Sequence, residues 1–304
     1  MQPLLSVIVV SWNTRELLAQ CLESLYQTIH VPYEVIVVDN ASEDGSVDMV
    51  RQRFPQAQLI VNDHNAGFTG GNNQALGVCQ GKYILLFNSD AVALPGAVDT
   101  LVNFAIVHPE AGIVGARLLN PDGSFQASFM DFPTLWSEFL MLSKLARVLK
   151  GSHYPSYPPQ QSQETRLVDW VTGACLLVRR EMVEEVGLLD ESYVTYSEEV
   201  DWCWRARKAG WQVYYVAEAS VLHWGGQSAA KMSSRRRGRV YASKALFFEK
   251  HRGRAYATVF RWLVWAVTGL KILSCLLGLV WPRPEVRRAA RQNLQSYRFV
   301  VESV

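Results

Sequence analysis

Short apolar runs rich in β-branched residues alternate with helix-forming segments through the first ninety residues. A run at residues 5–11 (LSVIVVS) is followed by leucines at helical spacing over 15–27 and by a second run at 33–38 (YEVIVV). Such continuous runs are typical of strands buried on both faces, and strand, helix and strand in this order form a parallel pair. The pattern continues with helices expected at 47–54 and 72–79 and strands at 57–61 and 83–87. It predicts an α/β fold with a parallel sheet covered by helices on both faces.

Composition narrows the class of protein further. The 304 residues are 49% hydrophobic and 19% charged, which argues against disorder and allows one large domain or two modest ones. Five scattered cysteines form no C-x-x-C pair, so we expect neither a disulfide framework nor a zinc site. The amino-terminal segment also lacks the basic start of a secretory signal peptide. These features favour a reducing, cytosolic environment.

Polar residues follow three of the expected strands, at the edge where sheets of this kind bind ligands. They are Ser11 and Asn13 after the first strand, Asp39 after the second, and Asn88, Ser89 and Asp90 after the fourth. Asp39 can accept a hydrogen bond from a ribose hydroxyl or a base N–H, as acidic residues do in nucleotide-binding folds. The alternative is structural, because Asp-Asn-Ala-Ser is also common turn and capping chemistry.

The first strand-to-helix turn excludes a dinucleotide fingerprint. Its sequence, Ser-Trp-Asn-Thr-Arg-Glu, contains no glycine, so the backbone cannot approach a pyrophosphate as a G-x-G-x-x-G loop does. A glycine-rich stretch containing Asn65, Gly67 and Gly71 comes later, directly before an expected helix. Small residues and amides there can fold around a sugar or phosphate, although the stretch can equally be a flexible loop and helix cap.

The chain divides by charge near residue 230. Residues 1–230 hold 14 Lys and Arg against 25 Asp and Glu, a net charge of −11, whereas 231–304 hold 16 against 3, a net charge of +13. We therefore predict an acidic globular domain at 1–230 and a basic helical region at 231–304. Basic runs can meet nucleic acid or anionic membranes, and many are simply solvated faces.

The basic region also contains the most apolar stretch of the chain, at 262–281, which favours a membrane surface over nucleic acid. Twenty helical residues extend about 30 Å, enough to cross a hydrocarbon core. Lys271 lies near the middle, where a charge is costly in a spanning helix but can snorkel from an interfacial one. The alternative is a helix that packs on the catalytic domain or on a second subunit.

The ordered motifs resemble a known family. SVIVVSWN, VIVVDNASEDGS, NAGFTGGNN, LLFNSDA, WVTGACLLVRRE, YSEEVDWCWRARKAGW and VLHWGG occur in the order in which inverting family 2 glycosyltransferases carry them. The resemblance covers residues 4–228 and is nearest to bacterial rhamnosyltransferases and galactofuranosyltransferases. It implies a GT-A fold, a nucleotide-diphosphate sugar donor, a divalent metal and inverting transfer to a hydroxyl.

The resemblance assigns the metal and donor residues. Asn88-Ser89-Asp90 matches the D-x-D element of the family, with Asn88 in place of the first acid and Asp90 as the charged ligand. His223 matches a family histidine that lies close to the metal after the last core strand. Oxygen ligands on Mg²⁺ or Mn²⁺ would neutralise the departing diphosphate, and an imidazole nitrogen suits Mn²⁺ better. Ser11, Asn13, Asp39, Asn65, Gly67, Gly71 and Ser89 complete the expected donor site.

The resemblance also assigns the catalytic base and the acceptor side. Glu198-Glu199-Val200-Asp201 matches an acidic-pair motif at a helix start, with Glu199 in place of the customary Asp as the base. Acids at a helix start also complement the helix dipole, which is the structural alternative for this cluster. Trp170, Gly173, Ala174 and Glu198 are expected on the acceptor side, where an indole face packs on a sugar.

The resulting hypothesis is a hexosyltransferase that builds surface polysaccharide on a lipid-linked glycan, with a dTDP-, UDP- or GDP-sugar donor. We expect it at the cytoplasmic face of the membrane, peripheral or shallowly inserted, without nucleic acid and with self-association left open. One alternative is a similar transferase with a soluble acceptor. Another is a non-catalytic glycan-binding or scaffold relative, motivated by Asn88 and Glu199.

Overall fold

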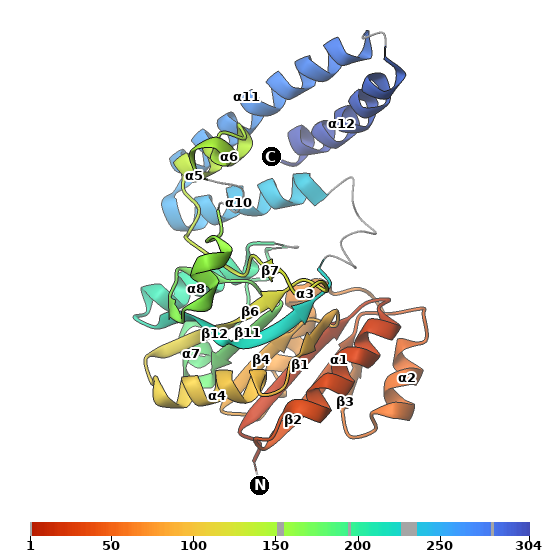
Figure 1. Cartoon of the computed structure of the whole chain (residues 1–304), viewed down its shortest axis with the longest axis vertical. Coiled ribbons are helices and arrows are strands. Elements are labelled where there is room, and N and C mark those ends of the chain that lie inside the picture. The colour runs from red at the N-terminus through yellow and green to blue at the C-terminus, as the bar shows by residue number, and fades with distance from the viewer. Residues whose placement is uncertain (1, 151–154, 194–195, 226–235, 281–282) are drawn as a thin grey trace. The chain divides into compact units, whose positions relative to one another are not determined.

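The apolar runs form neighbouring strands of one sheet in the computed structural model, which describes residues 2–150, 155–193, 196–225, 236–280 and 283–304 (Figure 1). Strand β1 pairs in parallel with β2 on one side and β4 on the other, and β2 pairs in parallel with β3. The bounds are β1 Leu5–Ser11, β2 Tyr33–Asp39, β3 Gln58–Val61 and β4 Tyr83–Phe87. The first half of the sheet is therefore the predicted parallel arrangement.

The second half of the sheet is mixed, which corrects the expectation of a fully parallel sheet. Strand β11 (Cys175–Arg179) runs antiparallel to both β4 and β6 (Ala111–Leu119), and β12 (Gln212–His223) is parallel to β6. Strand β5 (Ala91–Ala93) is antiparallel to β12 at the sheet edge. The whole order is β3-β2-β1-β4-β11-β6-β12-β5, with β7 (Phe125–Gln126) on β6 and β9 (Arg166–Leu167) on β12. A separate pair joins β8 (Phe129–Met130) to β10 (Trp170–Val171).

Helices cover both faces of this sheet (Figure 1). One apolar core joins alternate residues of β1, including Val7 and Val9, to α1 (Arg15–Thr28), α2 (Ser46–Arg53) and α4 (Ala97–Val107). The other core joins Ile8 and Ile36 to α3 (Gly67–Leu76), α7 (Arg180–Val186) and α8 (Glu198–Lys208). Because β1 and β4 are buried on both faces, their polar contacts with ligands can come only from the strand ends.

Helix α3 begins at Gly67, five residues before the predicted start at 72. The glycine-rich stretch is thus mostly helix, and the expected loop is confined to the residues before it. A Cβ at position 71 would lie 2.8 Å from the Val10 side chain, so glycine there allows α3 to pack closely on β1. Helix propensity counts against glycine, but tertiary packing compensates for it at this position.

The chain divides into two compact units. The first comprises Met1–Phe132, Pro155–Ser192 and Glu198–Ser228 and contains the sheet. The second comprises Pro133–Tyr154, Tyr193–Ser197 and Ala229–Val304, so part of the stretch before residue 155 belongs with the carboxyl-terminal helices. The predicted boundary at 230 and 231 lies in 226–235, outside the described residues.

The second unit is helical. Its elements are α5 (Leu135–Leu142), α6 (Ala146–Leu149), α10 (Arg236–Arg252), α11 (Arg254–Leu279) and α12 (Pro284–Ser303). Phe247, Phe248 and Phe260 are fully buried where α10 meets α11. Lys244 of α10 forms a 2.6 Å ion pair with the buried Glu138 of α5, and the Tyr256 hydroxyl of α11 accepts a hydrogen bond from the Leu135 amide. These contacts tie α5, α10 and α11 into one bundle.

Candidate active site

Strand direction brings the predicted site residues to one edge of the sheet. The carboxyl ends of β1, β2, β4, β6 and β12 all lie at this edge, as does the amino end of the antiparallel β11. His223 pairs with Ala91 across β12 and β5, which places it beside Asp90. The backbone amide of Asn88 donates to the Ala174 carbonyl at 3.0 Å. This bond places the segment before β11 beside the end of β4.

Asp90, His223 and Asn88 form a polar cluster there. Nε2 of His223 lies 3.2 Å from Oδ1 of Asp90 and 3.3 Å from Nδ2 of Asn88. The Trp224 amide donates to the Asp90 carbonyl, which fixes the backbone of the cluster. The Asp90 side chain is directed to His223, and the N-cap of α4 is Gly96.

Gln126, on the two-residue strand β7, orients the His223 ring. Its Nε2 donates to the His223 carbonyl at 3.0 Å and to Oδ1 of Asn120 at 2.9 Å, while its Oε1 lies 2.6 Å from Nδ1 of His223. The two donor contacts identify Oε1 as the acceptor, so Nδ1 carries the ring proton in the neutral imidazole. Nε2 is then unprotonated, accepts from Nδ2 of Asn88 and lies beside Oδ1 of Asp90. Sequence analysis missed Gln126, because no motif surrounds it.

The donor set of this cluster fits a divalent cation. A lone pair on His223 Nε2 and a carboxylate oxygen of Asp90 repel each other at 3.2 Å unless a proton or a metal ion lies between them. Imidazole nitrogen and carboxylate oxygen together are ligands that suit Mn²⁺. Within the described ranges, no group of three His, Cys, Asp or Glu side chains could hold a metal. Asp90 and His223 are thus the two side chains here that could hold such an ion, and its other ligands would have to come from a bound donor and water.

The ends of β1 and β2 form a second polar pocket. Oδ1 of Asp39 accepts from the Ser42 amide at 2.8 Å, and Oδ2 is buried without a hydrogen-bond partner among the described residues. Asn13 has a left-handed backbone (φ 53°), donates its amide to the Ser42 hydroxyl and accepts from the Glu43 amide. A buried carboxylate oxygen without a partner costs free energy, so this atom is suited to accept a donor from a ligand.

The other predicted donor residues lie around these two clusters. The Ser11 hydroxyl lies 3.0 Å from the Thr14 hydroxyl, which in turn donates to the Ser89 hydroxyl, so the first and fourth strand ends are joined. The Asn65 side chain accepts from the Gly67 backbone amide at 2.8 Å, in the turn that leads into α3. The structure therefore gives Asn65, Gly67 and Gly71 local structural contacts, and their part in donor binding stays a prediction.

Glu198 and Glu199 begin α8, as the sequence indicates, and left-handed backbone at Tyr196 and Ser197 precedes them. Glu198 is buried, Glu199 is half-buried, and Oε2 of each is buried without a hydrogen-bond partner in the described part of the chain. A Cβ at Gly173 would lie 4.0 Å from Cβ of Glu199, so the glutamate adjoins the predicted acceptor segment. The residue after Gly173 is Ala174, whose carbonyl accepts the hydrogen bond from the Asn88 backbone amide. Glu199 therefore lies near the strand end that carries Asn88.

Burial controls the protonation of this acidic pair. Desolvation raises the pKa of Glu199 from its ordinary 4.5 to about 7. Desolvation, followed by repulsion from Glu199, raises the pKa of Glu198 well above the usual range. A carboxyl with a pKa near 7 can accept a proton at neutral pH more readily than an ordinary glutamate, because its conjugate acid is weaker. This shift is what a general base requires, and a helix-dipole role alone would not produce it.

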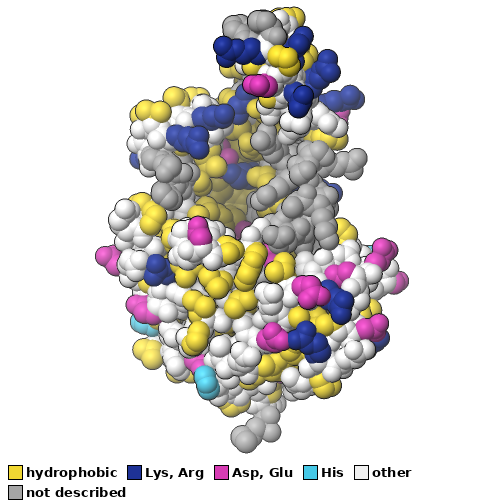
Figure 2. Space-filling model, turned by 45° about the vertical axis from the view of Figure 1, so that its right-hand side comes forward, with side chains coloured by type: hydrophobic (Ala, Val, Ile, Leu, Met, Phe, Trp, Pro, Cys, Tyr) yellow, Lys and Arg dark blue, Asp and Glu magenta, His cyan; other side chains and the backbone are white. Residues whose placement is uncertain are grey.

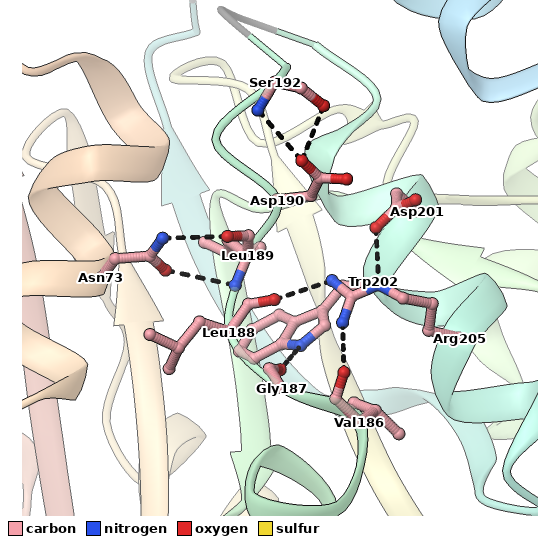
Figure 3. Close-up of polar contacts among 10 residues, drawn as sticks. All are labelled: Asn73, Val186, Gly187, Leu188, Leu189, Asp190, Ser192, Asp201, Trp202 and Arg205. Atoms are coloured by element: carbon pink, nitrogen blue, oxygen red, sulfur yellow. Dashed lines mark hydrogen bonds and ion pairs between the residues drawn. The ribbon is translucent and has the colours of Figure 1, made fainter. Parts of the chain in front are cut away.

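The segment before α8 is held by side chains of α3 and α8 (Figure 3). Asn73 bonds the backbone of Leu189 through both ends of its amide, at 2.9 and 3.2 Å. Trp202 donates to the Gly187 carbonyl, and Arg205 donates to the Val186 and Leu188 carbonyls while pairing with Asp201 at 2.7 Å. Asp201 thus serves the local structure. These bonds fix the start of the helix that carries Glu199.

The predicted acceptor residues have mixed surroundings. Trp170 is half-buried on β10, packs against the second core and donates its indole N–H to the Asp131 carbonyl at 3.0 Å. Gly173 is in contact with Phe68, because a Cβ there would lie 3.2 Å from its ring. A larger side chain at position 173 would therefore push on Phe68 and approach Glu199.

The fold is that of the GT-A class of glycosyltransferases. Among solved structures, a mannosyltransferase from Pyrobaculum calidifontis in complex with GDP-mannose and Mn²⁺ has a TM-score of 0.57 at 15% identity, covering 100% of this chain and 87% of that one. GalNAc-T7 with UDP, GalNAc and Mn²⁺ has a TM-score of 0.56 at 13% identity, covering 83% and 51%. At such identities the likeness shows the fold alone.

Sequence comparison gives the family. The profile of Glycosyl transferase family 2 matches residues 6–187, and this chain belongs to that family. It is 30% identical over 314 residues to the N-acetylglucosaminyl-diphospho-decaprenol L-rhamnosyltransferase of Mycobacterium tuberculosis, covering 97% of this chain and 98% of that protein. It is 25% identical to the low-salt glycan biosynthesis hexosyltransferase Agl10 of Haloferax volcanii, covering 72% and 66%. The prediction of a rhamnosyltransferase-like family 2 glycosyltransferase is confirmed.

Proposed function

We propose that this glycosyltransferase moves a sugar, with rhamnose as the first candidate, from a nucleotide-diphosphate donor to a hydroxyl of a lipid-linked glycan, with inversion at the anomeric carbon. One observation carries the proposal. The Asp90 and His223 pair and the buried Glu199 carboxyl lie at the same edge of the sheet, connected through Asn88, Ala174 and Gly173. A leaving-group site and a base are the two parts that one-step transfer needs.

The donor lies along the ends of β1, β2 and β4 in this proposal. The base and ribose are placed by Asn13 and by the unpartnered Oδ2 of Asp39, with the diphosphate toward Asp90. A bound Mg²⁺ or Mn²⁺ would stabilise negative charge on the departing diphosphate. Asp90 and His223 would hold that ion, and Gln126 keeps Nε2 of His223 unprotonated beside Asp90. The structural neighbours bound to GDP-mannose or UDP with Mn²⁺ support a donor of this chemical class.

Glu199 is the proposed base. As the acceptor oxygen attacks the anomeric carbon from the side opposite the phosphate, Glu199 takes the hydroxyl proton and the bond to the phosphate oxygen breaks. The sugar is thereby transferred in one displacement, which inverts its configuration. The raised pKa of Glu199 allows this transfer near neutral pH. Burial and repulsion from Glu199 raise the pKa of Glu198, which favours the neutral form of that carboxyl beside the base.

The acceptor proposal rests on the mycobacterial relative. That protein matches this chain over nearly its whole length, including the carboxyl-terminal helices, and its name states a decaprenol-linked acceptor. By length and composition α11 is the one candidate span among the described helices. We therefore place the enzyme at the cytoplasmic face of a membrane, where a lipid-linked acceptor for surface polysaccharide is found.

A transfer assay tests this function. The purified chain is incubated with dTDP-, UDP- or GDP-sugars, Mn²⁺ and a short-chain diphospholipid-linked N-acetylglucosamine, and the product is followed by mass and by NMR of the new anomeric centre. The expected result is transfer from one donor class to the lipid-linked glycan with inverted configuration. Retention of configuration would overturn the single-displacement mechanism, and equal rates with a soluble glycan would favour the soluble-acceptor alternative.

A further inference from the structure

Helix α11 has two opposite faces with different environments. Ala257, Phe260, Val264 and Thr268 are buried at intervals of three and four residues, so they form one face of the helix. The other face carries exposed apolar side chains at the same spacing. We call this face the α11 stripe, which consists of Val259, Trp262, Trp265, Leu270, Leu273, Leu276, Leu277 and Val280.

Lys271, the charged residue within the apolar stretch 262–281, does not lie on the α11 stripe. Lys271 follows Thr268 by three residues and precedes Cys275 by four, so it lies on the packed face, where it is half-buried. From Trp262 to Val280 the stripe itself carries no charged residue. Leu270 and Leu277 are 69% and 63% exposed, which is unusual for leucines of a soluble bundle.

Helix α12 folds back along α11 within this unit. Near the end of α11, Gly278 packs against Val286 and Ala290, and at the other end of α12 Phe299 and Ser303 approach Gly238 of α10. Helix α12 also exposes four arginines, Arg287, Arg288, Arg291 and Arg298. Figure 2 shows the dark blue basic side chains gathered over these helices.

This arrangement is incompatible with α11 as a lone membrane span. A lone spanning helix is surrounded by lipid and needs a predominantly apolar surface, and charged residues at its middle are costly. Helix α12 would have to enter the hydrocarbon alongside α11 and take exposed arginines with it. A helix with one apolar face and basic residues beside it is instead typical of the membrane interface.

We propose that the α11 stripe is an in-plane docking surface for an anionic bilayer, into which its tryptophans and leucines insert while α11 stays in one leaflet. The +13 charge of residues 231–304 gives the electrostatic complement, and this favours an anionic lipid surface over a second copy of the same basic region. The inference deepens the proposed function, because it states how the enzyme is held at the membrane that carries its acceptor.

Vesicle binding tests the surface. The full chain is sedimented with vesicles of phosphatidylcholine alone or with phosphatidylglycerol, and is compared with the double variant Leu273→Glu/Leu277→Glu. Wild type should bind anionic vesicles in preference and lose binding as salt rises, and the double variant should bind at least about tenfold less tightly. Val107→Glu is the matched control, because Val107 is 72% exposed at the end of α4 in the sheet unit. Unchanged binding of the double variant would overturn the proposal.

A labelling experiment separates in-plane docking from spanning. Single cysteines replace the exposed Gln292 of α12 or Gln52 of α2, and an impermeant maleimide is added to sealed vesicles that carry the protein. Equal labelling at both positions is expected, and protection of position 292 alone would show that α11 crosses the bilayer.

The oligomeric state gives a further check. A wild-type dimer that does not bind vesicles, together with a monomeric double variant, would show that a second copy of the chain covers the α11 stripe and would overturn the proposal. Donor-induced thermal shifts, measured without lipid, report separately on the proposed function.

Discussion

The sheet unit and the carboxyl-terminal helices place their apolar residues in different environments. All five residues of β4 are buried, whereas 26 residues of α11 include only four buried ones. Both segments are apolar in sequence. The protein core covers the side chains of β4 but leaves most side chains of α11 uncovered. Hydropathy therefore identifies side chains that must leave water, and only packing shows whether protein or another phase receives them.

The charges differ in the same way. The acidic residues of the sheet unit include the buried Glu198 and half-buried Glu199 at the start of α8 and the Asp90 carboxylate, all at one edge. Most basic residues described in the helical unit are exposed, including four arginines on α12. Chemistry in one unit and lipid contact in the other should thus be separable by substitution.

The largest expected effect is from Glu199→Gln. Loss of the base should lower kcat by about 10²- to 10⁴-fold, because general bases contribute that much, while vesicle binding stays unchanged. Glu181→Gln, an exposed glutamate of α7, is the matched control. The measurement is transfer under saturating donor together with sedimentation. Activity within about threefold of wild type would remove Glu199 from the chemistry.

Asp90→Asn should next weaken metal-dependent donor binding by roughly a hundredfold, because an amide oxygen carries no charge to offset the ion. Calorimetric titration of the nucleotide with and without Mn²⁺ measures this effect. Equal donor affinity in both proteins, in the presence of Mn²⁺, would contradict the assigned role. Binding to anionic vesicles should again not change.

Gln126→Ala should lower Mn²⁺ affinity by about 10- to 100-fold, the usual cost of losing a partner that orients a metal ligand. The electron paramagnetic resonance signal of free Mn²⁺, measured with the nucleotide present, reports this affinity without turnover. Gln163→Ala is the control, since the Gln163 amide oxygen accepts a solvent-exposed hydrogen bond from Arg117 and not from a histidine. Wild-type affinity in Gln126→Ala would show that His223 needs no such support.

The pH dependence follows from the raised pKa of Glu199. Its folded-state pKa is about 7 against 4.5, so the carboxyl favours the folded state most below pH 4.5 and loses this contribution as pH rises toward 7. Glu199→Gln should therefore raise the melting temperature at pH 8, where the wild-type carboxyl is ionised, but not at pH 4.5. Each unit of difference in pKa between the folded and unfolded states corresponds to about 1.4 kcal/mol. Thermal unfolding at both pH values checks the sign. Activity of wild type should rise with pH up to about 7.

Asn73→Ala should have the smallest effect. It removes two hydrogen bonds to the Leu189 backbone and should lower the free energy of unfolding by about 1 to 3 kcal/mol, with a modest fall in kcat. Denaturant unfolding and steady-state kinetics measure the two quantities. Asn103→Ala, on helix α4 at the opposite face of the sheet, serves as the comparison. A large change in donor affinity instead would give Asn73 a direct binding role.

Much of the site could be predicted because strand ends are visible in sequence. The apolar runs placed Asp39 and Asp90 at the ends of β2 and β4, and the parallel strands then required them to share an edge. The start of α8 at Glu198 was predicted from the acidic-pair motif of the family. Family resemblance added His223, whose position beside Asp90 depends on the pairing of β5 with β12.

Other features depend on long-range packing that one sequence does not display. Gln126, on a two-residue strand, contacts a histidine 97 positions away, so no local pattern marks it. The low helix propensity of glycine argues against a helix that includes Gly71. The close fit of Gly71 against Val10 compensates for this cost, and helix α3 begins earlier than predicted. The packed face of α11 is likewise known only from the structure, because the stretch is apolar on all sides; the buried Val264 and Thr268 then place Lys271 on that face.

Donor-induced thermal stabilisation tests the central claim most directly. The melting temperature is measured with dTDP-, UDP- and GDP-sugars, each with Mn²⁺ or with EDTA, on wild type, Asp90→Ala and Glu199→Gln, with each change taken from that protein's own baseline. One nucleotide should stabilise wild type and Glu199→Gln in the presence of Mn²⁺, and the stabilisation should disappear with EDTA or in Asp90→Ala. Stabilisation that survives in Asp90→Ala, or none with any donor, would contradict a metal-bound donor site at this edge of the sheet.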